Sequence, residues 1–274
     1  MTGGIFARWA DTHPAKVALV SVAVFAGYFV FVGLTSGTSL GHGQMQKDLA
    51  HYAASLWPQA ALAFTALGIV FLAGWMRPAR ITTSVQLSGL IWLAPTLCLL
   101  AILLAFAFTS GNGSFVLDPE TAWKACLLFL LVGVFEEILF RGILMHGLTQ
   151  RFGPVIALFA SSGIFGTMHF VNWIEGQPLD GTAQQVLHAS ASGLLYGAIV
   201  LRTGSIWPAV FLHAIWDASI AFSAEMMAAL PKGPPEDTSL IASGFFVLFD
   251  AVVGLLVLRS YLRQQPRINE GARR

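Results

Sequence analysis

The segment Val132–Gly147, with the sequence VGVFEEILFRGILMHG, decides how the rest of the chain is interpreted. It places two adjacent carboxylates, Glu136 and Glu137, and the guanidinium of Arg141 inside an otherwise apolar stretch of helical character. A charged side chain at the centre of a membrane-spanning helix costs about 2.5–3.5 kcal/mol. Three such groups within six residues are therefore expected to be paired, to face a cavity or to take part in function.

The composition of the whole chain indicates a membrane protein. Of its 274 residues, 56% are hydrophobic and 11% are charged, whereas soluble domains carry about 25% charged residues. The net charge of +1, with a basic block only in the C-terminal tail, gives no sign of a nucleic-acid partner. Cys98 and Cys126 lie in apolar stretches and are expected to be small buried hydrophobic residues, not a disulfide or a metal site.

Hydropathy predicts about eight membrane spans of roughly bilayer length. They cover residues 16–34, 56–76, 85–109, 122–148, 154–170, 186–201, 206–227 and 240–262. Eleven of the fifteen Lys and Arg residues fall on the side of the two termini, which the positive-inside rule places in the cytoplasm. We therefore expect an all-α polytopic protein of the cell (inner) membrane. Its single membrane domain, residues 1–274, would have about eight transmembrane helices around a polar intramembrane cavity.

Helical geometry separates the two glutamates. Residues four apart share a face of an α-helix, so Glu137 and Arg141 are expected to form an ion pair. Glu136 points about 100° away from Glu137, onto a different face. The segment thus offers one carboxylate paired within the helix and a second one for another use. The alternative is a structural ion-pair cluster that holds helices together.

Later spans supply further ionisable side chains at a similar depth. His169 ends the span that follows, and His213 and Asp217 share one face of another. Glu136 lies 15 residues before Arg151, and His169 lies 18 residues after it. At 1.5 Å per residue, both are about 20–25 Å from the cytoplasmic edge. A lone histidine often makes only a contact between helices. Here four ionisable side chains from three spans are expected in one layer, which suggests a hydrated active site inside the bilayer: Glu136, His169, His213 and Asp217.

Three short motifs in these segments resemble those of the CAAX protease and bacteriocin-processing family, the Rce1-type intramembrane endopeptidases. The motifs are EExxxR at Glu136–Arg141, FxxxH at Phe165–His169, and a histidine followed four residues later by an acidic residue at His213–Asp217. They occur in the family's order, and the resemblance covers roughly residues 122–219. The earlier spans match only in being apolar.

The resemblance implies a role for each matched residue. Glu136 would be the general base that activates water, and His169 would help to hold that water. His213 and the residue at 217 would stabilise the oxyanion of the tetrahedral intermediate. The remaining matched residues would be structural or orienting: Glu137, Arg141 and Phe165. The family has Asn where this chain has Asp217, and an ionised carboxylate cannot donate a hydrogen bond to an oxyanion. Asp217 could instead be protonated, orient His213 or ligate a metal.

The resemblance leaves the cofactor open. Two histidines with carboxylates can bind Zn²⁺, so the alternatives are no metal or a zinc ion. The zinc ligands would be Glu136, His169, His213 and Asp217.

The expected function is an intramembrane endopeptidase, similar to a CAAX prenyl protease, that uses a Glu-activated water. Its partners would be the lipid bilayer and a peptide or protein substrate, prenylated or membrane-associated, that arrives from the cytoplasmic side or laterally. Two other functions stay open: a non-catalytic immunity or scaffold protein, and a proton-coupled transporter. The sequence shows no inverted repeat of the kind common in transporters.

Overall fold

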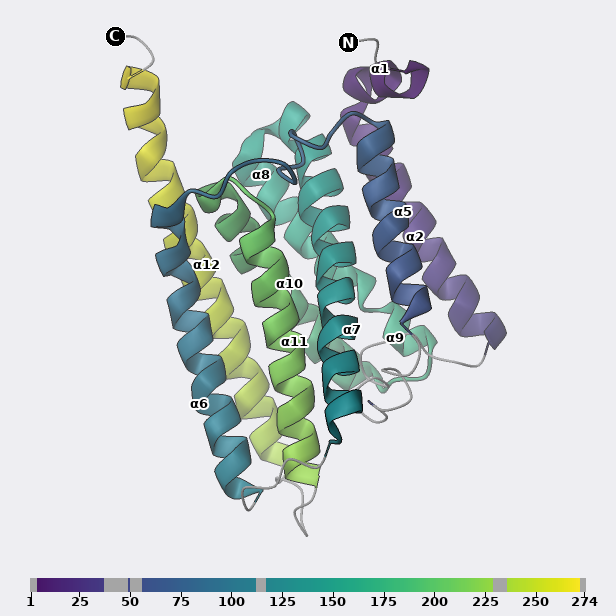
Figure 1. Cartoon of the computed structure of the whole chain (residues 1–274), viewed down its shortest axis with the longest axis vertical. Coiled ribbons are helices and arrows are strands. Elements are labelled where there is room, and N and C mark those ends of the chain that lie inside the picture. Colours follow the sequence, from purple (N-terminus) through teal and green to yellow (C-terminus); the bar gives the residue numbers. More distant parts are fainter. Residues whose placement is uncertain (1–3, 37–48, 50–55, 112–116, 229–235, 272–274) are drawn as a thin grey trace.

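The computed structural model describes residues 4–36, 49, 56–111, 117–228 and 236–271. Every regular element in these ranges is helical. The elements are α1 (Ile5–Thr12), α2 (Pro14–Ser36), α5 (Trp57–Leu72), η1 (Leu87–Leu93), α6 (Ala94–Ser110), α7 (Pro119–Glu137), η2 (Ile138–Leu144), α8 (Met145–Met168), α9 (Val171–Ile174), α10 (Leu179–Thr203), α11 (Trp207–Ala228) and α12 (Glu236–Gly271). The long helices form an upright bundle, with α1 and the last turns of α12 at the same end (Figure 1).

The bundle is that of an all-α membrane protein, as predicted. Three stretches are long and apolar enough to cross a membrane: Pro14–Val32, Leu87–Ser110 and Ser243–Gln265. Large apolar side chains on these helices point outward, among them Val24, Phe31, Ile102, Phe106 and Leu248, as expected of surfaces that face lipid. Each of the eight predicted spans overlaps a helix, while the count of eight membrane crossings stays a prediction.

Helix α10 lies at the centre of the bundle, packed against α8, α11 and α12. Its residues Leu195, Ala198, Ile199 and Val200 are completely buried. Close approach depends on small residues, since a Cβ atom on Gly193 would lie only 3.2 Å from the Cα atom of Ser162 in α8. The sequence GxxxG at 193–197 is thus a helix-packing face. This packing fixes α8 beside α10 and so positions the residues at the end of α8.

The helix that carries the glutamates is not a regular α-helix throughout. We expected one helix over residues 122–148, but the structure changes from α-helix to a π-helix at Ile138–Leu144, directly after Glu137. All seven π-helical residues are buried, so the irregular turn lies inside the bundle. Single π turns inside α-helices are frequent at functional sites. The chain then turns at Gly153, whose φ angle of 78° suits glycine.

Two expectations about the surroundings of the site were wrong or incomplete. Cys98 and Cys126 are exposed, not buried, because the apolar helix faces that carry them point toward lipid and not into the core. The predicted span over residues 85–109 consists of two elements, because the shorter helix η1 precedes α6. Pro95 lies in the first turn of α6, where proline is well tolerated.

Candidate active site

The predicted ion pair of the opening motif is confirmed. Arg141 Nη1 donates a hydrogen bond of 2.7 Å to Glu137 Oε1, and neither side chain is exposed. The two residues meet across the junction of α7 and η2 because they are four positions apart. A buried carboxylate and guanidinium neutralise one another, which offsets part of the desolvation cost of placing either inside the bundle.

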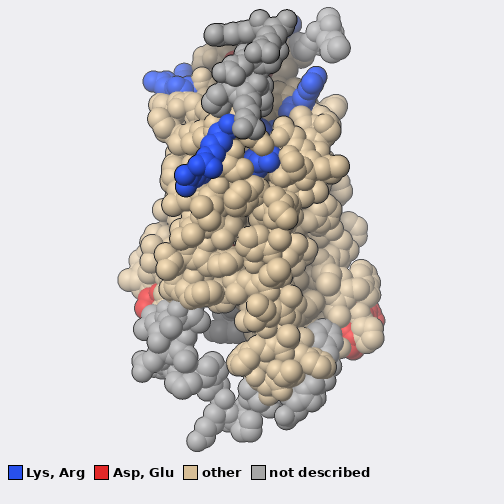
Figure 2. All heavy atoms as spheres, turned by 90° about the vertical axis from the view of Figure 1, so that its left-hand side faces the viewer, with Lys and Arg blue, Asp and Glu red and all other residues tan. Residues whose placement is uncertain are grey.

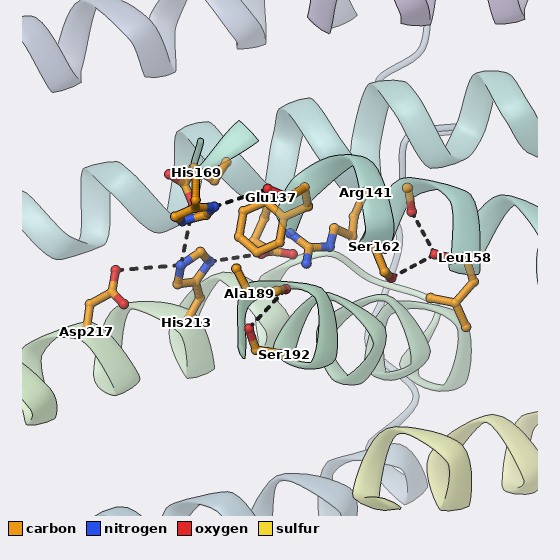
Figure 3. Close-up of polar contacts among 12 residues, drawn as sticks. Glu137, Arg141, Leu158, Ser162, His169, Ala189, Ser192, His213 and Asp217 are labelled. Atoms are coloured by element: carbon orange, nitrogen blue, oxygen red, sulfur yellow. Dashed lines mark hydrogen bonds and ion pairs between the residues drawn. The ribbon is translucent and has the colours of Figure 1, made fainter. Parts of the chain in front are cut away.

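Glu137 has a second partner that sequence reasoning missed. Its Oε1 atom lies 2.9 Å from Nδ1 of His213 in α11. Because a carboxylate accepts hydrogen bonds, Nδ1 is the protonated nitrogen. Glu137 therefore orients the imidazole ring and directs its other nitrogen, Nε2, away from the ion pair (Figure 3).

Nε2 of His213 faces the other two carboxylates of the predicted site. It lies 3.6 Å from Glu136 Oε2 and 3.6 Å from Asp217 Oδ2. The side chains of Glu136 and Asp217 are 13% and 12% exposed, whereas His213 is 5% exposed. Glu136 in α7 and Asp217 in α11 thus both lie near the same nitrogen of His213. Figure 3 shows Asp217 and His213 on the same side of α11.

His169 approaches the same region from the end of α8. Its Nδ1 atom donates to the backbone oxygen of Phe165 at 3.1 Å, which leaves Nε2 as the nitrogen directed elsewhere. The ring of Phe165 stands edge-on to both His169 and His213, with centroid distances of 5.3 and 6.0 Å. The FxxxH motif therefore places one aromatic ring between two histidines.

Glu136 and His169 line a common pocket of about 600 Å³, including its open mouth. Helices α2, α5, α7 and η2, the end of α8 and the segment around α9 supply its walls. The lining is mainly apolar, with Phe29, Val132, Phe135, Leu139, Phe140, Phe165, Met168 and Val171 beside the polar residues Gln59, Glu136, His169, Asn172 and Glu175. Such a pocket suits an apolar ligand held by a few polar groups.

Aromatic rings enclose the ion pair and the histidine. The guanidinium of Arg141 lies 4.4 Å from the ring centroid of Phe165 and 5.6 Å from that of Tyr196. Tyr196, which is 1% exposed, also stacks on His213 with centroids 5.0 Å apart. Sequence reasoning did not single out Tyr196. Its one signal is a phenol in an otherwise small and apolar stretch of α10.

The geometry was also compared with the requirements of a metal site. Among the residues that the structure describes, no three His, Cys, Asp or Glu side chains are arranged to hold a metal ion together. Nδ1 of His213 donates to Glu137, and Nδ1 of His169 donates to a backbone carbonyl. Metal-ligating histidines usually make such hydrogen bonds and bind the metal through the other nitrogen. The zinc ligand set of Glu136, His169, His213 and Asp217 therefore stays a prediction.

A second buried acidic group lies behind the site. Asp250 in α12 is 1% exposed, and its Oδ2 atom lies 3.3 Å from Nε2 of His188 in α10. His188 in turn packs on Trp216, with ring centroids 5.0 Å apart. This pair connects α10 with α12 and is separate from the pocket that Glu136 lines.

Comparison with known proteins agrees with the motif resemblance. Residues 118–219 match the family model described as Type II CAAX prenyl endopeptidase Rce1-like. No curated protein and no solved structure matches the chain. The matched range contains all the predicted site residues, from Glu136 to Asp217. Residues 118–219 of this membrane protein are thus similar to the Rce1-like family of CAAX prenyl endopeptidases.

Proposed function

We propose that the protein is an intramembrane endopeptidase that hydrolyses a peptide bond with a water molecule activated by Glu136. One observation carries this proposal. Glu136 and His169 line the same pocket, and Glu136 is 3.6 Å from a histidine whose other nitrogen is held by a buried carboxylate. An oriented acid–base pair beside an apolar pocket is what peptide hydrolysis requires.

The first step uses the two residues of the pocket wall. Glu136 accepts a proton from a water molecule that Nε2 of His169 helps to hold. The water oxygen attacks the carbonyl carbon of the peptide bond and forms a tetrahedral intermediate. Glu136 then passes its proton to the leaving amine, so that one carboxylate serves first as base and then as acid.

His213 is the group that would stabilise the oxyanion. Its two ring nitrogens face carboxylates on opposite sides, Glu137 at Nδ1 and both Glu136 and Asp217 at Nε2. These neighbours favour the doubly protonated ring, in which both nitrogens donate hydrogen bonds. Nε2–H can therefore donate to the oxyanion. In this scheme Asp217 balances the charge of His213 and need not donate a hydrogen bond itself.

The proposed substrate is a peptide or protein segment that reaches the pocket within the membrane, and a prenyl group on it is implied only by the family. No step of the mechanism passes through a metal ion. The zinc prediction is tested by measuring the metal content of the purified protein, together with cleavage after dialysis against a chelator.

The decisive variant is Glu136→Gln, which keeps the shape of the side chain and removes the base. In detergent, with a set of internally quenched peptides of apolar sequence as the probe, we expect cleavage to fall by about 10²–10⁴-fold. The matched control is Glu120→Gln in the same helix. That carboxylate is 70% exposed and pairs with Lys124, so this variant should cleave like the wild type.

The proposal fails if Glu136→Gln cleaves at the wild-type rate. It fails also if the wild-type protein cleaves no peptide although its cooperative unfolding shows that it is folded in the same detergent. That result would favour a scaffold role. Uptake into proteoliposomes that follows a pH gradient and is lost in Glu136→Gln would point to the transporter alternative.

A further inference from the structure

The imidazole ring of His213 needs more than one contact to keep its direction. Its Nδ1 atom donates to Glu137 Oε1 at 2.9 Å, but the ring can still tilt about this single hydrogen bond. The last torsion angle of a histidine side chain has a broad preference, so the surroundings decide it. In the proposed mechanism Nε2 must point at the oxyanion. The neighbours that fix the plane of the ring therefore matter for the reaction.

Two aromatic rings surround this imidazole. Tyr196 in α10 stacks on its face, with ring centroids 5.0 Å apart and an angle of 25° between the planes. Phe165 stands edge-on to it, at 6.0 Å and 79°. Tyr196 is 1% exposed and is itself held in the core of the bundle. Because interiors are closely packed, the imidazole cannot tilt toward Tyr196 without meeting the phenol ring.

Tyr196 also contacts the other residue that donates to Glu137. The guanidinium of Arg141 lies 5.6 Å from the ring centroid of Tyr196 and 4.4 Å from that of Phe165. Among the described residues, Nε and Nη2 of Arg141 have no hydrogen-bond partner, so the aromatic faces meet this part of the cation. The single ring of Tyr196 thus touches both donors that share Oε1 of Glu137.

The surroundings strengthen the contact between the cation and the rings. On the face drawn in Figure 2, a broad band across the middle of the described residues shows no Lys, Arg, Asp or Glu. The Glu137–Arg141 pair has no exposed side-chain surface and lies inside the bundle. A cation held over an aromatic face is attracted most strongly where water is excluded. Loss of the Tyr196 ring would therefore loosen Arg141 as well as His213.

A glycine one helical turn before Tyr196 makes room for this arrangement. Gly193 lies three positions before Tyr196, so both are on the same side of α10. A Cβ atom on Gly193 would lie 3.1 Å from Cδ1 of Phe165 and 3.2 Å from Nη2 of Arg141. The glycine lets these two side chains approach α10 closely, and the tyrosine one turn later covers the face of His213.

We infer that Tyr196 is a positioning residue of the proposed endopeptidase. Its ring holds the imidazole of His213 and the guanidinium of Arg141 against Glu137, so that Nε2 of His213 stays directed at the reacting carbonyl. The inference rests on the proposed function and adds a residue that lies outside the three motifs. The contacts are made by the face of the ring and not by the hydroxyl, so a phenyl ring is sufficient. Tyr196 takes no part in proton transfer.

The test compares Tyr196→Phe, which keeps the ring, with Tyr196→Leu, which removes it. In detergent, with the quenched peptides as the probe, Tyr196→Phe should keep kcat within about threefold of the wild-type value. Tyr196→Leu should lower kcat by about 10–100-fold, because a misplaced Nε2 no longer meets the oxyanion. Its KM should stay within about twofold, since Tyr196 does not belong to the pocket lining. Should Tyr196→Leu not accumulate in the membrane, Tyr196→Met replaces it.

Val257→Ala is the matched control for lost stability. Val257 is completely buried in α12, a helix that supplies no residue of the site, and its truncation leaves a cavity in the core. Thermal unfolding should show a lower Tm for Val257→Ala and for Tyr196→Leu, but kcat should fall only in Tyr196→Leu. The inference is overturned if Tyr196→Leu keeps the wild-type kcat. It is overturned as well if Tyr196→Phe or Val257→Ala loses as much kcat as Tyr196→Leu.

Nuclear magnetic resonance in detergent tests the same placement without any cleavage. The protein is labelled with ¹⁵N at its seven histidines. The Nδ1 proton of His213, held by Glu137, should exchange slowly with solvent, and it is assigned by its absence from His213→Gln. We expect this proton in the wild type and in Tyr196→Phe, and its loss through faster exchange in Tyr196→Leu. Its absence from the wild type, or its persistence in Tyr196→Leu, would overturn the inference.

The two readouts separate this inference from the proposed function. If the proton behaves as expected but the folded wild type cleaves no peptide, the proposed function fails and the placement of His213 by Tyr196 stands. If the wild type cleaves peptides but the proton persists in Tyr196→Leu, the endopeptidase stands and Tyr196 is not its positioning residue.

Discussion

At the scale of single residues, Glu137 connects the parts of the site. Its Oε1 atom accepts hydrogen bonds from Arg141 within its own helix region and from His213 in α11. The first contact could be predicted because it depends only on helical spacing. The second joins residues 76 positions apart, and no local pattern announces it. Tyr196 was missed for the same reason, since its stacking on His213 depends on how α10 packs beside α11.

Asp217 is the residue at which the chain departs from the family motif, and Asp217→Asn restores the family's residue. We expect this variant to remain active, because the amide can donate to the oxyanion. Its rate should stay within about tenfold of the wild-type rate. The measurement is peptide cleavage in detergent.

Asp217→Ala serves as the control for this variant. It removes the anion and supplies no donor, so its rate should fall below that of Asp217→Asn. Equal rates of the two variants would contradict a polar role for the side chain at position 217.

At the scale of elements, hydropathy located the helices but not their irregularities. Every predicted span coincides with a helix because a chain that crosses lipid needs long apolar runs. The π-helix Ile138–Leu144 could not be predicted, since no local signal such as proline marks it. The short helix α9 lies between the predicted spans 154–170 and 186–201, where hydropathy gives no signal for a helix. Helix ends with a capping residue, in contrast, can be recognised directly from sequence.

Asp118 is such a cap, at the start of the helix that carries Glu136. The Thr121 hydroxyl and backbone N–H donate to it at 2.7 and 3.0 Å, and these hydrogen bonds hold the pKa of Asp118 below its ordinary value. We expect Asp118→Ala to fray the first turn of α7, whereas Asp118→Asn retains an oxygen acceptor and should have less effect. Hydrogen exchange of residues 117–125 measures the difference.

The pH dependence of this cap has a definite sign. Because folding lowers the pKa of Asp118, its contribution is complete above the ordinary value of 3.8 and is lost as the pH falls through the lower folded value. After correction for intrinsic exchange rates, the wild type should therefore approach the Ala variant only in strong acid. Asp180→Ala, which removes a carboxylate from the first turn of another helix, should leave exchange of residues 117–125 unchanged.

At the scale of the whole molecule, the site depends on how closely α7 and α11 approach. A Cβ atom on Gly133 would lie 2.9 Å from the backbone oxygen of Val210, so a methyl group there must push the two helices apart. These helices carry the glutamates and His213. We expect Gly133→Ala to lower the free energy of unfolding by about 1–3 kcal/mol and to reduce cleavage further than this loss explains. Thermal unfolding and peptide cleavage in detergent provide the two measurements.

Gly163→Ala is the matched control, because a Cβ atom at Gly163 in α8 meets no other atom within 4 Å. It should retain wild-type stability and cleavage. Equal behaviour of the two variants would show that the approach of α7 to α11 does not set the geometry of the site.

The buried π-helix Ile138–Leu144 has a consequence for the energy supply of a cell. A polar site inside a bilayer shortens the barrier against protons, and about 2.3 kcal/mol per charge is stored for each 100 mV of membrane potential. Around Gly142 in this helix, Ala79, Ile143, Leu144 and Ile206 are each at most 1% exposed, and a layer packed in this way leaves little room for water. The protein can thus hold a polar site without short-circuiting the membrane in which it works.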